Sequence, residues 1–250
     1  MDDIEQHKPD GKLEHDHSRE AIANRLADGV RVNYLRDWIY GGIDGAVTTF
    51  AIVAGVQGAG MSAKIILILG VANLVADGFS MAASNFSGTK AEVDEAHKLR
   101  EMEHRHVTHH PDGEREELRQ ILAAKGLSGD ALEAAVEALS ENKTTWVEFM
   151  LTEEFGVPRV LRSPIKAALS TFAAFSLCGL VPLLPYLFNL PNAFTTASIM
   201  TGAVFFGIGA AKSRWSLASW WWSGLETFLI GTVAALAAYG IGAGLDALVA

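Results

Sequence analysis

Residues 37–56 read DWIYGGIDGAVTTFAIVAGV, and residues 65–86 read IILILGVANLVADGFSMAASNF. Each stretch is long and apolar enough to cross a bilayer as a helix, since a spanning helix needs about 20 apolar residues. Each also holds an acidic residue well inside it, Asp44 in the first and Asp77 in the second. A carboxylate near the bilayer centre costs roughly 3 kcal/mol. We therefore expect both carboxylates to face a protein interior or a water-filled path.

The apolar half of the chain gathers in five stretches that qualify as spans. They are residues 38–60, 64–86, 164–188, 193–212 and 220–248. No strand pattern interrupts them, so the sequence predicts an all-α membrane protein with five transmembrane helices and a helical insert between the second and third. We divide it into a tail (1–37), helices 1 and 2 (38–86), a metal-binding insert (87–162) and helices 3 to 5 (163–250).

Basic residues mark one side of this membrane protein. They lie in the tail (Lys8, Lys12, Arg19, Arg25, Arg31 and Arg36), in the insert, and after the fourth span (Lys212 and Arg214). The other links are almost bare of positive charge. This pattern predicts a cytosolic N-terminus and insert, and a C-terminus outside. The chain begins without the pattern of a signal peptide, and we favour a bacterial cytoplasmic membrane, or the vacuolar membrane in a eukaryote.

The net charge of −9 is not that of a nucleic-acid-binding protein, so we expect no nucleic-acid partner. Much of the charge lies in the insert, where 16 Asp or Glu oppose 10 Lys or Arg. Such a segment repels anionic lipid head groups and attracts divalent cations.

The helical pattern has few interruptions. No proline lies between residues 64 and 110, so the second span is expected to continue into the insert as one helix. After Pro111 a helix is expected up to Gly126, and one further helix from Ser128 to about residue 155. Pro182 and Pro185 are expected to kink the third span.

Polar residues of the first two spans recur at helical spacing. Asn73, Asp77 and Met81 share one face of the second span, and Asp44 and Thr48 share one face of the first. Carboxylates can replace part of the hydration shell of a divalent cation, and a thioether favours iron over magnesium. These five residues are our candidate cation path.

A purely structural interpretation stays open for the acidic residues. Asp44 and Asp77 would then bond to the backbone, or to Arg36 and Lys212. Glu226, near the start of the fifth span, either pairs with Lys212 or Arg214 or lies at the mouth of the path. Gly41 and Gly45 form a small-xxx-small pair around Asp44, so the close packing of two first spans is a further possibility.

The insert carries three pairs of ligand-type residues at helical spacing. They are Glu103 with His106, Glu114 with Glu117, and Met150 with Glu154. Carboxylate, imidazole and thioether together suit Fe²⁺, Mn²⁺ or Zn²⁺ better than Ca²⁺. Because Glu is an ordinary surface residue, each pair taken alone is equally consistent with a solvated helix face. Other histidines (His15, His17, His104, His109 and His110) add ligands without a defined geometry.

Four stretches resemble the vacuolar iron transporter family. The first two are NYLRDWIYGGIDGAVTTFAIVAGVQGAG (33–60) and NLVADGFSMAASNF (73–86). The others, PDGEREELRQILAAKGLS (111–128) and WVEFMLTEEFG (146–156), resemble the metal-binding domain that some members carry. The resemblance implies a homodimer with its path between the first spans, and export of Fe²⁺ in exchange for protons. It implies no prosthetic group, and Mn²⁺, Zn²⁺ and Co²⁺ are further candidate ions.

Residue by residue, the resemblance makes Asp44 and Met81 path residues. It makes ligands of Glu103, Glu114, Glu117, Met150 and Glu154. Three positions depart from the family pattern as we understand it. His106 and Asn73 stand where glutamate is expected, and Leu151 stands where some members have a second methionine. Proton coupling at residue 73 is therefore in doubt.

Three functions follow, and the first is our leading hypothesis: a proton-coupled Fe²⁺ and Mn²⁺ transporter. The second is a membrane-anchored metal sensor or store. The third is a ferritin-like di-iron oxidase, suggested by Glu101-x-x-His104 and Glu103-x-x-His106. A ferritin-like site needs two such motifs and further glutamates on four helices. We therefore expect that the chain is not an enzyme.

Overall fold

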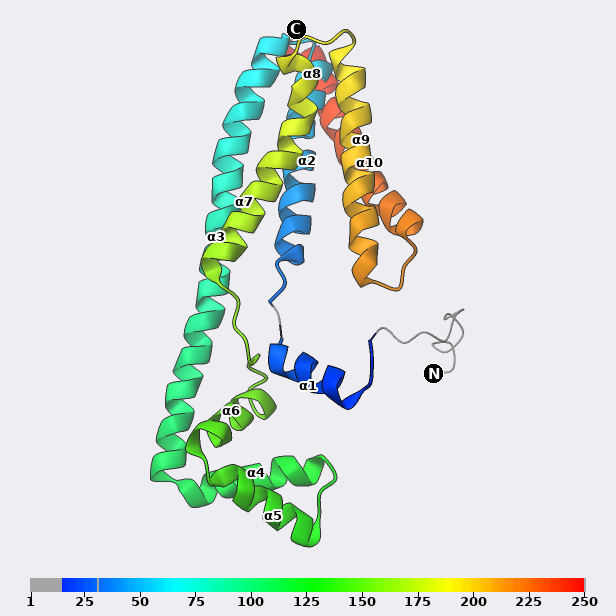
Figure 1. Cartoon of the computed structure of the whole chain (residues 1–250). Coiled ribbons are helices and arrows are strands. Elements are labelled where there is room, and N and C mark those ends of the chain that lie inside the picture. The colour runs from blue at the N-terminus through cyan, green and yellow to red at the C-terminus, as the bar shows by residue number, and fades with distance from the viewer. Residues whose placement is uncertain (1–14, 31, 250) are drawn as a thin grey trace.

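The computed structural model describes residues 15–30 and 32–249, and within them every regular element is helical (Figure 1). Five helices are long and apolar enough to cross a membrane. They are α2 (Leu35–Gly58), α3 (Ala63–His109), the run from α7 to α8 (Pro164–Leu187), α9 (Ala193–Lys212) with the 3₁₀ turn η2 (Ser213–Trp215), and α10 (Trp220–Val249). The expected number and order of apolar helices are confirmed.

The third span is interrupted where its prolines lie. Helix α7 (Pro164–Leu180) ends one residue before a 3₁₀ turn, η1 (Val181–Leu183), which holds Pro182. A single further turn, α8 (Leu184–Leu187), holds Pro185. Each proline lacks an N–H to donate within a helix, which accounts for the change of helix type.

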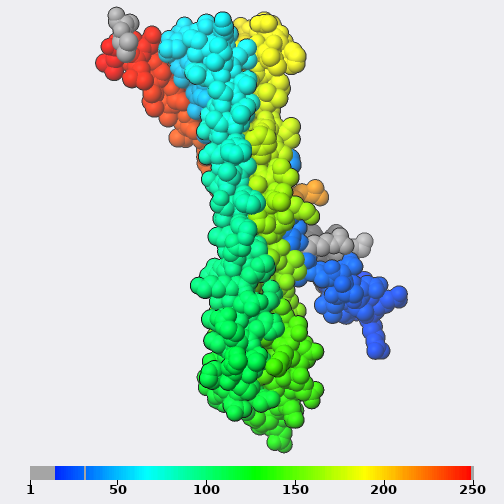
Figure 2. Space-filling view, turned by 90° about the vertical axis from the view of Figure 1, so that its left-hand side faces the viewer, coloured from blue at the N-terminus to red at the C-terminus, as the bar shows by residue number. Residues whose placement is uncertain are grey.

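Helix α3 is continuous from the bundle of spans to the insert, as expected. It has 47 residues, runs beside α7 and then continues beyond the bundle, where it packs against α6 of the insert (Figures 1 and 2). Pro111 begins the next helix, α4 (Pro111–Ala124), so the chain turns at the first proline after residue 64. One rigid element therefore carries residues of both candidate sites.

The insert folds around its own core. After α4, Gly126 ends the helix with a φ of +97°, as expected of a residue that tolerates left-handed backbone. Helices α5 (Gly129–Ser140) and α6 (Lys143–Glu153) follow. Together with the end of α3 they bury an apolar cluster of eight residues. These are Val107, Leu118, Leu122, Val136, Trp146, Val147, Met150 and Leu151.

The prediction of one helix from Ser128 to about residue 155 is wrong. The helix breaks at residues 141 and 142, where the side chain of Asn142 accepts hydrogen bonds from the backbone N–H groups of Thr144 and Thr145. An asparagine in this role starts a new helix, because it satisfies donors that a helix end leaves free. Ser128 does lie at the N-cap position of α5, but its side chain makes no capping bond.

The tail contains an unpredicted helix, α1 (Arg19–Asp28), which buries no residue. It projects to one side, between the bundle and the insert (Figure 1). Three of the tail's basic residues that entered the prediction of orientation, Lys8, Lys12 and Arg31, lie outside the described residues.

Helix α2 packs against α7 through glycines. A Cβ atom on Gly45 would lie 2.2 Å from the carbonyl oxygen of Phe175, and one on Gly41 would lie 2.4 Å from that of Thr171. From the other side, a Cβ on Gly179 would lie 2.7 Å from the carbonyl oxygen of Gly45. The small-residue pair Gly41 and Gly45 thus packs against α7 of the same chain. This face of α2 is therefore not free to pack against a second copy of α2.

Replacing Gly45 with alanine should destabilise the bundle by about 1–3 kcal/mol, the usual cost of overpacking. Backbone atoms of Phe175 stand where the new methyl group would go, and neither helix can yield without separating from the other. Thermal unfolding in detergent measures the effect. Gly88→Ala, on α3 with nothing within 4 Å of its would-be Cβ, is the control and should not lower the melting temperature. Equal stability of the two variants would contradict this packing argument.

Candidate functional site

The polar residues of the first two spans lie along one seam between α2 and α3. Asn73 on α3 donates a hydrogen bond to the hydroxyl of Thr48 on α2, with 3.2 Å between nitrogen and oxygen. Asp44 and Asp77 are close enough for their charges to repel each other. Asp44 is half-buried and Asp77 is exposed on the single chain, so the seam is open on one side. The structure brings together the faces that helical spacing predicted.

The structural interpretation of these two carboxylates finds no support. Within the described residues, the carboxylate of neither Asp44 nor Asp77 takes part in a hydrogen bond or a salt bridge. Lys212 pairs instead with Glu226 at 3.2 Å, which is one of the alternatives left open for Glu226. The guanidinium of Arg36 lies over the ring of Tyr40.

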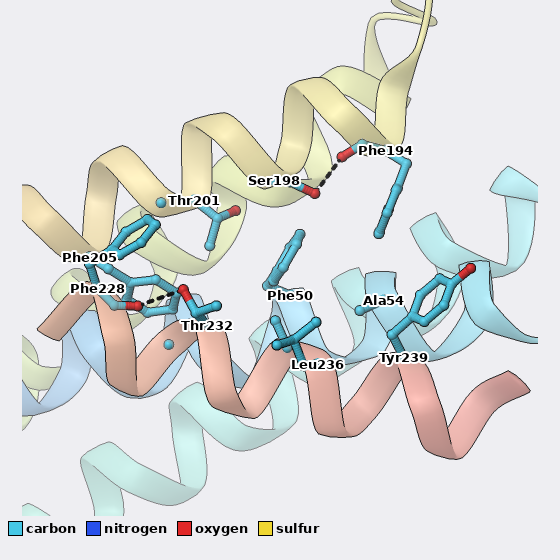
Figure 3. Close-up of a pocket in the computed structure, with 13 residues that line it drawn as sticks. Phe50, Ala54, Phe194, Ser198, Thr201, Phe205, Phe228, Thr232, Leu236 and Tyr239 are labelled. Atoms are coloured by element: carbon cyan, nitrogen blue, oxygen red, sulfur yellow. Dashed lines mark hydrogen bonds between the residues drawn. The ribbon is translucent and has the colours of Figure 1, made fainter. Parts of the chain in front are cut away.

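A separate cavity of about 440 Å³ lies between α2, α9 and α10 (Figure 3). Its walls are mostly aromatic rings and small residues. Ser198 and Thr232 donate their hydroxyl protons to the backbone carbonyls of Phe194 and Phe228, as the dashed lines in Figure 3 mark. No charged side chain lines this cavity. A divalent cation would find no charged oxygen ligand there, so the seam of α2 and α3 is the better candidate path.

The insert brings acidic side chains together around the end of α3. Glu103 and His106 on α3 and Glu114 on α4 each offer a ligand atom, and these atoms lie within 4.8 Å of one another. His106 Nδ1 is 3.3 Å from Glu114 Oε1. One carboxylate oxygen of Glu103 and one of Glu114 are buried without a hydrogen-bond partner. Oxygens left in this state are suited to a cation, because a buried unpaired polar group is costly.

The electrostatics of the insert link two further residues to this cluster. Burial raises the pKa of the Glu103 carboxyl to about 8, and its hydrogen bond with Glu114 and the charges of Glu114, Glu154 and Glu117 add to the shift. Burial likewise raises the pKa of Glu154, and the charges of Glu117 and Glu114 raise it further. Four carboxylates from three helices therefore converge on one place.

The remaining predicted ligands differ in placement. Met150 on α6 is fully buried in the core of the insert, one turn before Glu154, which directly follows this helix, and Leu151 is buried in the same core. The side chain of His106 is about half exposed (48%), so solvent reaches the cluster there. Of the di-iron motif, Glu101 and His104 are exposed and lie outside the cluster.

A third cluster of polar side chains, which we did not predict, lies where the seam meets the insert. Asp37, in the first turn of α2, is 2% exposed and pairs with Arg162, which precedes α7. Asn85 on α3 donates to Asp37 Oδ1 and to Thr171 Oγ1, each at 2.7 Å. The signal was present, because the four-residue series of Asn73, Asp77 and Met81 continues at Asn85.

The pattern of the family described as the VIT family matches residues 35–243 of the chain. The chain belongs to the VIT family. A protein named vacuolar iron transporter from Centaurea cyanus is 35% identical over 216 residues, 84% of this chain and 87% of the relative. Vacuolar iron transporter 1 from Arabidopsis thaliana is 33% identical over 212 residues, 82% of this chain and 83% of the relative. The vacuolar iron transporter of Toxoplasma gondii is 31% identical over 229 residues, 87% of this chain and 76% of the relative.

Membership of the VIT family confirms the resemblance drawn from the motifs of residues 33–60 and 73–86. It also establishes a multi-pass membrane protein and confirms the expectation that the chain is not an enzyme. The match covers both groups of predicted residues, the seam of α2 and α3 and the acidic cluster of the insert.

The acidic cluster of this VIT-family chain should make its stability depend on pH. In the unfolded chain Glu103 has the ordinary pKa of 4.5, whereas the folded chain keeps the proton up to about pH 8. Between these values the folded state binds more protons than the unfolded state. The free energy of unfolding therefore falls as pH rises from about 4.5 to about 8. The melting temperature of the chelator-treated protein should therefore fall as pH rises through this range.

Glu103→Gln should flatten that loss, because glutamine keeps the shape of the protonated carboxyl without titrating. The exposed neighbour Glu101→Gln is the matched control and should keep the pH dependence of the parent chain. A Glu103→Gln chain with the same pH profile as the parent would show that this carboxyl is not held protonated.

Proposed function

We propose that this protein moves divalent transition-metal ions across a membrane, with Fe²⁺ as the main cargo and Mn²⁺, Zn²⁺ and Co²⁺ as further candidates. The observation that carries the proposal is the pair Asp44 and Asp77. They are carboxylates of neighbouring spans on a common seam, without any hydrogen bond or salt bridge among the described residues. Relatives 31–35% identical are named vacuolar iron transporters, which supports iron.

The donor set supports a transition metal over Mg²⁺ or Ca²⁺. The seam offers carboxylates from Asp44 and Asp77 and the half-buried thioether of Met81, one turn after Asp77 on α3. The insert offers carboxylates with the imidazole of His106. Imidazole and thioether are poor ligands for hard cations and good ones for Fe²⁺. In our proposal the insert lies in the cytosol, captures the metal and delivers it to the seam.

Proton exchange follows from the same groups. A carboxylate that releases a metal ion in a site of low polarity is more stable as the neutral acid, so it takes up a proton. Export of Fe²⁺ from the cytosol with return of protons would use Asp44 and Asp77 in turn. Because Asn73 is an amide already bonded to Thr48, it cannot carry a proton in this exchange.

The exposure of Asp77 supports a homodimer. On the single chain this carboxylate of a spanning helix lies at the surface, where it would meet lipid at a cost of about 3 kcal/mol. A second copy placed over the seam would remove the carboxylate from lipid and close the path. Because the glycine face of α2 is already occupied by α7, the second copy must approach the side of α2 that carries Asp44.

Asp44→Asn should abolish metal flux in proteoliposomes loaded with a metal-quenched dye and a pH dye. The parent chain should show quenching with a coupled pH change when Fe²⁺ or Mn²⁺ is added. The isosteric amide removes the charge that binds the cation and the site that takes the proton. Glu226→Gln, a carboxylate bonded to Lys212 on the surface, is the control and should transport normally.

Full flux in the Asp44→Asn chain would contradict the proposed path. Absence of flux in the parent chain, with metal still bound to the purified protein, would favour the sensor or store, in which the insert binds metal and the spans only anchor it. The separate apolar core of the insert gives that alternative its structural basis.

The purified protein should be a dimer in a membrane mimetic. Native mass spectrometry should give twice the chain mass of 26.8 kDa. Asp77→Leu should weaken the dimer, because a leucine costs nothing when the separated chain exposes it to lipid, and this driving force for association is lost. A monomer that transports metal at the parent rate would contradict the shared path.

A further inference from the structure

A polar knot closes the end of the seam that faces the insert. It consists of Asp37, Asn85, Arg162 and Thr171, from α2, α3, the segment before α7, and α7 itself. Asn85 also donates to the carbonyl oxygen of Ala167 at 3.3 Å. Both oxygens of Asp37 are therefore occupied, one by the amide of Asn85 and the other by the guanidinium of Arg162. The guanidinium neutralises the charge of the buried carboxylate, so the pair presents no net charge to an approaching cation.

Two cavities meet at this knot. The first, of about 280 Å³, lies between α3 and the segment that leaves α6, and Leu99, Phe155 and Leu161 are among the residues that line it. The second, of about 300 Å³, lies on the other side of Arg162 and reaches Met81 and Ser84 on the seam. Only Glu92 and Arg162 line both cavities.

The two cavities lie along α3 between the two candidate metal sites. Phe155, which lines the first, follows Glu154 of the acidic cluster in the sequence, and Met81 of the path lines the second. A cation that travels this way must pass Arg162. As long as the permanently charged guanidinium stays there, it occupies the passage and leaves no free negative charge on Asp37 to attract a divalent cation.

We propose that Arg162 is the gate between the insert and the transmembrane path, and that it opens by exchanging Asp37 for Glu92 as its partner. In the closed arrangement Arg162 neutralises Asp37. In the open arrangement the guanidinium pairs with Glu92, and the freed Asp37 carboxylate receives the cation on its way to Met81. This inference rests on the proposed function and assigns to it an entry site that the path residues do not include.

The placement of Arg162 suits a moving part. It belongs to a non-helical segment that links α6, the helix of Met150, to α7. The guanidinium lies 5.5 Å from the centroid of the Tyr34 ring, and its Nε is buried without a hydrogen-bond partner. Glu92 is exposed and forms no salt bridge among the described residues, so its carboxylate is available.

The first test compares initial rates of Mn²⁺ flux for the parent, Arg162→Gln and Arg162→Lys in proteoliposomes at subsaturating metal. If Arg162 is a charge gate, Arg162→Gln should raise the rate about fivefold or more, a typical size for the coupling of two sites. Arg162→Lys should stay near the parent rate. Flux that falls in Arg162→Gln would overturn the proposal and leave the ion pair a purely structural contact.

The second test does not depend on disturbing a buried pair. Glu92→Gln removes the acceptor for Arg162 and should lower the rate about fivefold or more. Asp94→Asn, two residues further on the same helix and paired with Lys90, lines neither cavity and should transport at the parent rate. A Glu92→Gln chain with parent flux would overturn the gate even if Arg162→Gln fails to fold.

Metal binding by the insert, measured by quenching of tryptophan fluorescence, serves as the control. It should be unchanged in all these variants, because none of the three substituted residues belongs to the acidic cluster. Loss of flux in the parent chain itself would instead count against the proposed transport function.

Discussion

The architecture depends on the cost of holding a carboxylate in a membrane. The free-energy cost of burying Asp44 and Asp77 is avoided only if protein or water, rather than lipid, faces their carboxylates. In the single chain two faces of α2 have different roles. One face, with Gly41 and Gly45, lies against the backbone of α7, and the seam with α3 holds the polar residues. Close glycine packing on one side thus leaves the other side for chemistry.

The continuity of α3 joins the two candidate sites. Along 47 residues it presents Asn73, Asp77 and Met81 to the seam, Asn85 to the polar knot, and Glu103 with His106 to the acidic cluster. Because no proline interrupts this helix, the seam and the cluster lie on one continuous element. The non-helical segment between α6 and α7 gives the insert a second connection to the bundle, and Arg162 lies on it.

Much of this could be predicted from the sequence, and the exceptions have physical reasons. Periodicity found the spans, the continuous α3 and the shared faces, because apolar spacing and absent prolines act locally. It failed at residues 141 and 142, where the side chain of Asn142 outcompetes the helix for backbone donors. An asparagine that can cap a helix is recognisable in the sequence. The residues around Asn142, however, do not show whether it starts a new helix or lies within a continuous one.

The partners of polar residues were the harder problem. The four-residue series on α3 placed Asn85 on the correct face, yet its partners Asp37 and Thr171 lie 48 and 86 residues away in the sequence. The glycine pair of α2 was recognised as a packing motif, but the sequence does not say whether a second copy or another helix of the same chain fills it. Tertiary contacts decide both questions.

Proton binding at the acidic cluster affects how the proposed transport of metal would work. Without metal, Glu103 holds a proton up to about pH 8, so a cation that binds the cluster at neutral pH must displace it. The displaced proton makes binding weaker than the number of carboxylates suggests. A capture site of moderate affinity is an advantage in a transporter, because an ion held too tightly would not leave for the seam. If the insert captures metal as proposed, the like charges gathered around Glu103 would therefore aid its release as well as its capture.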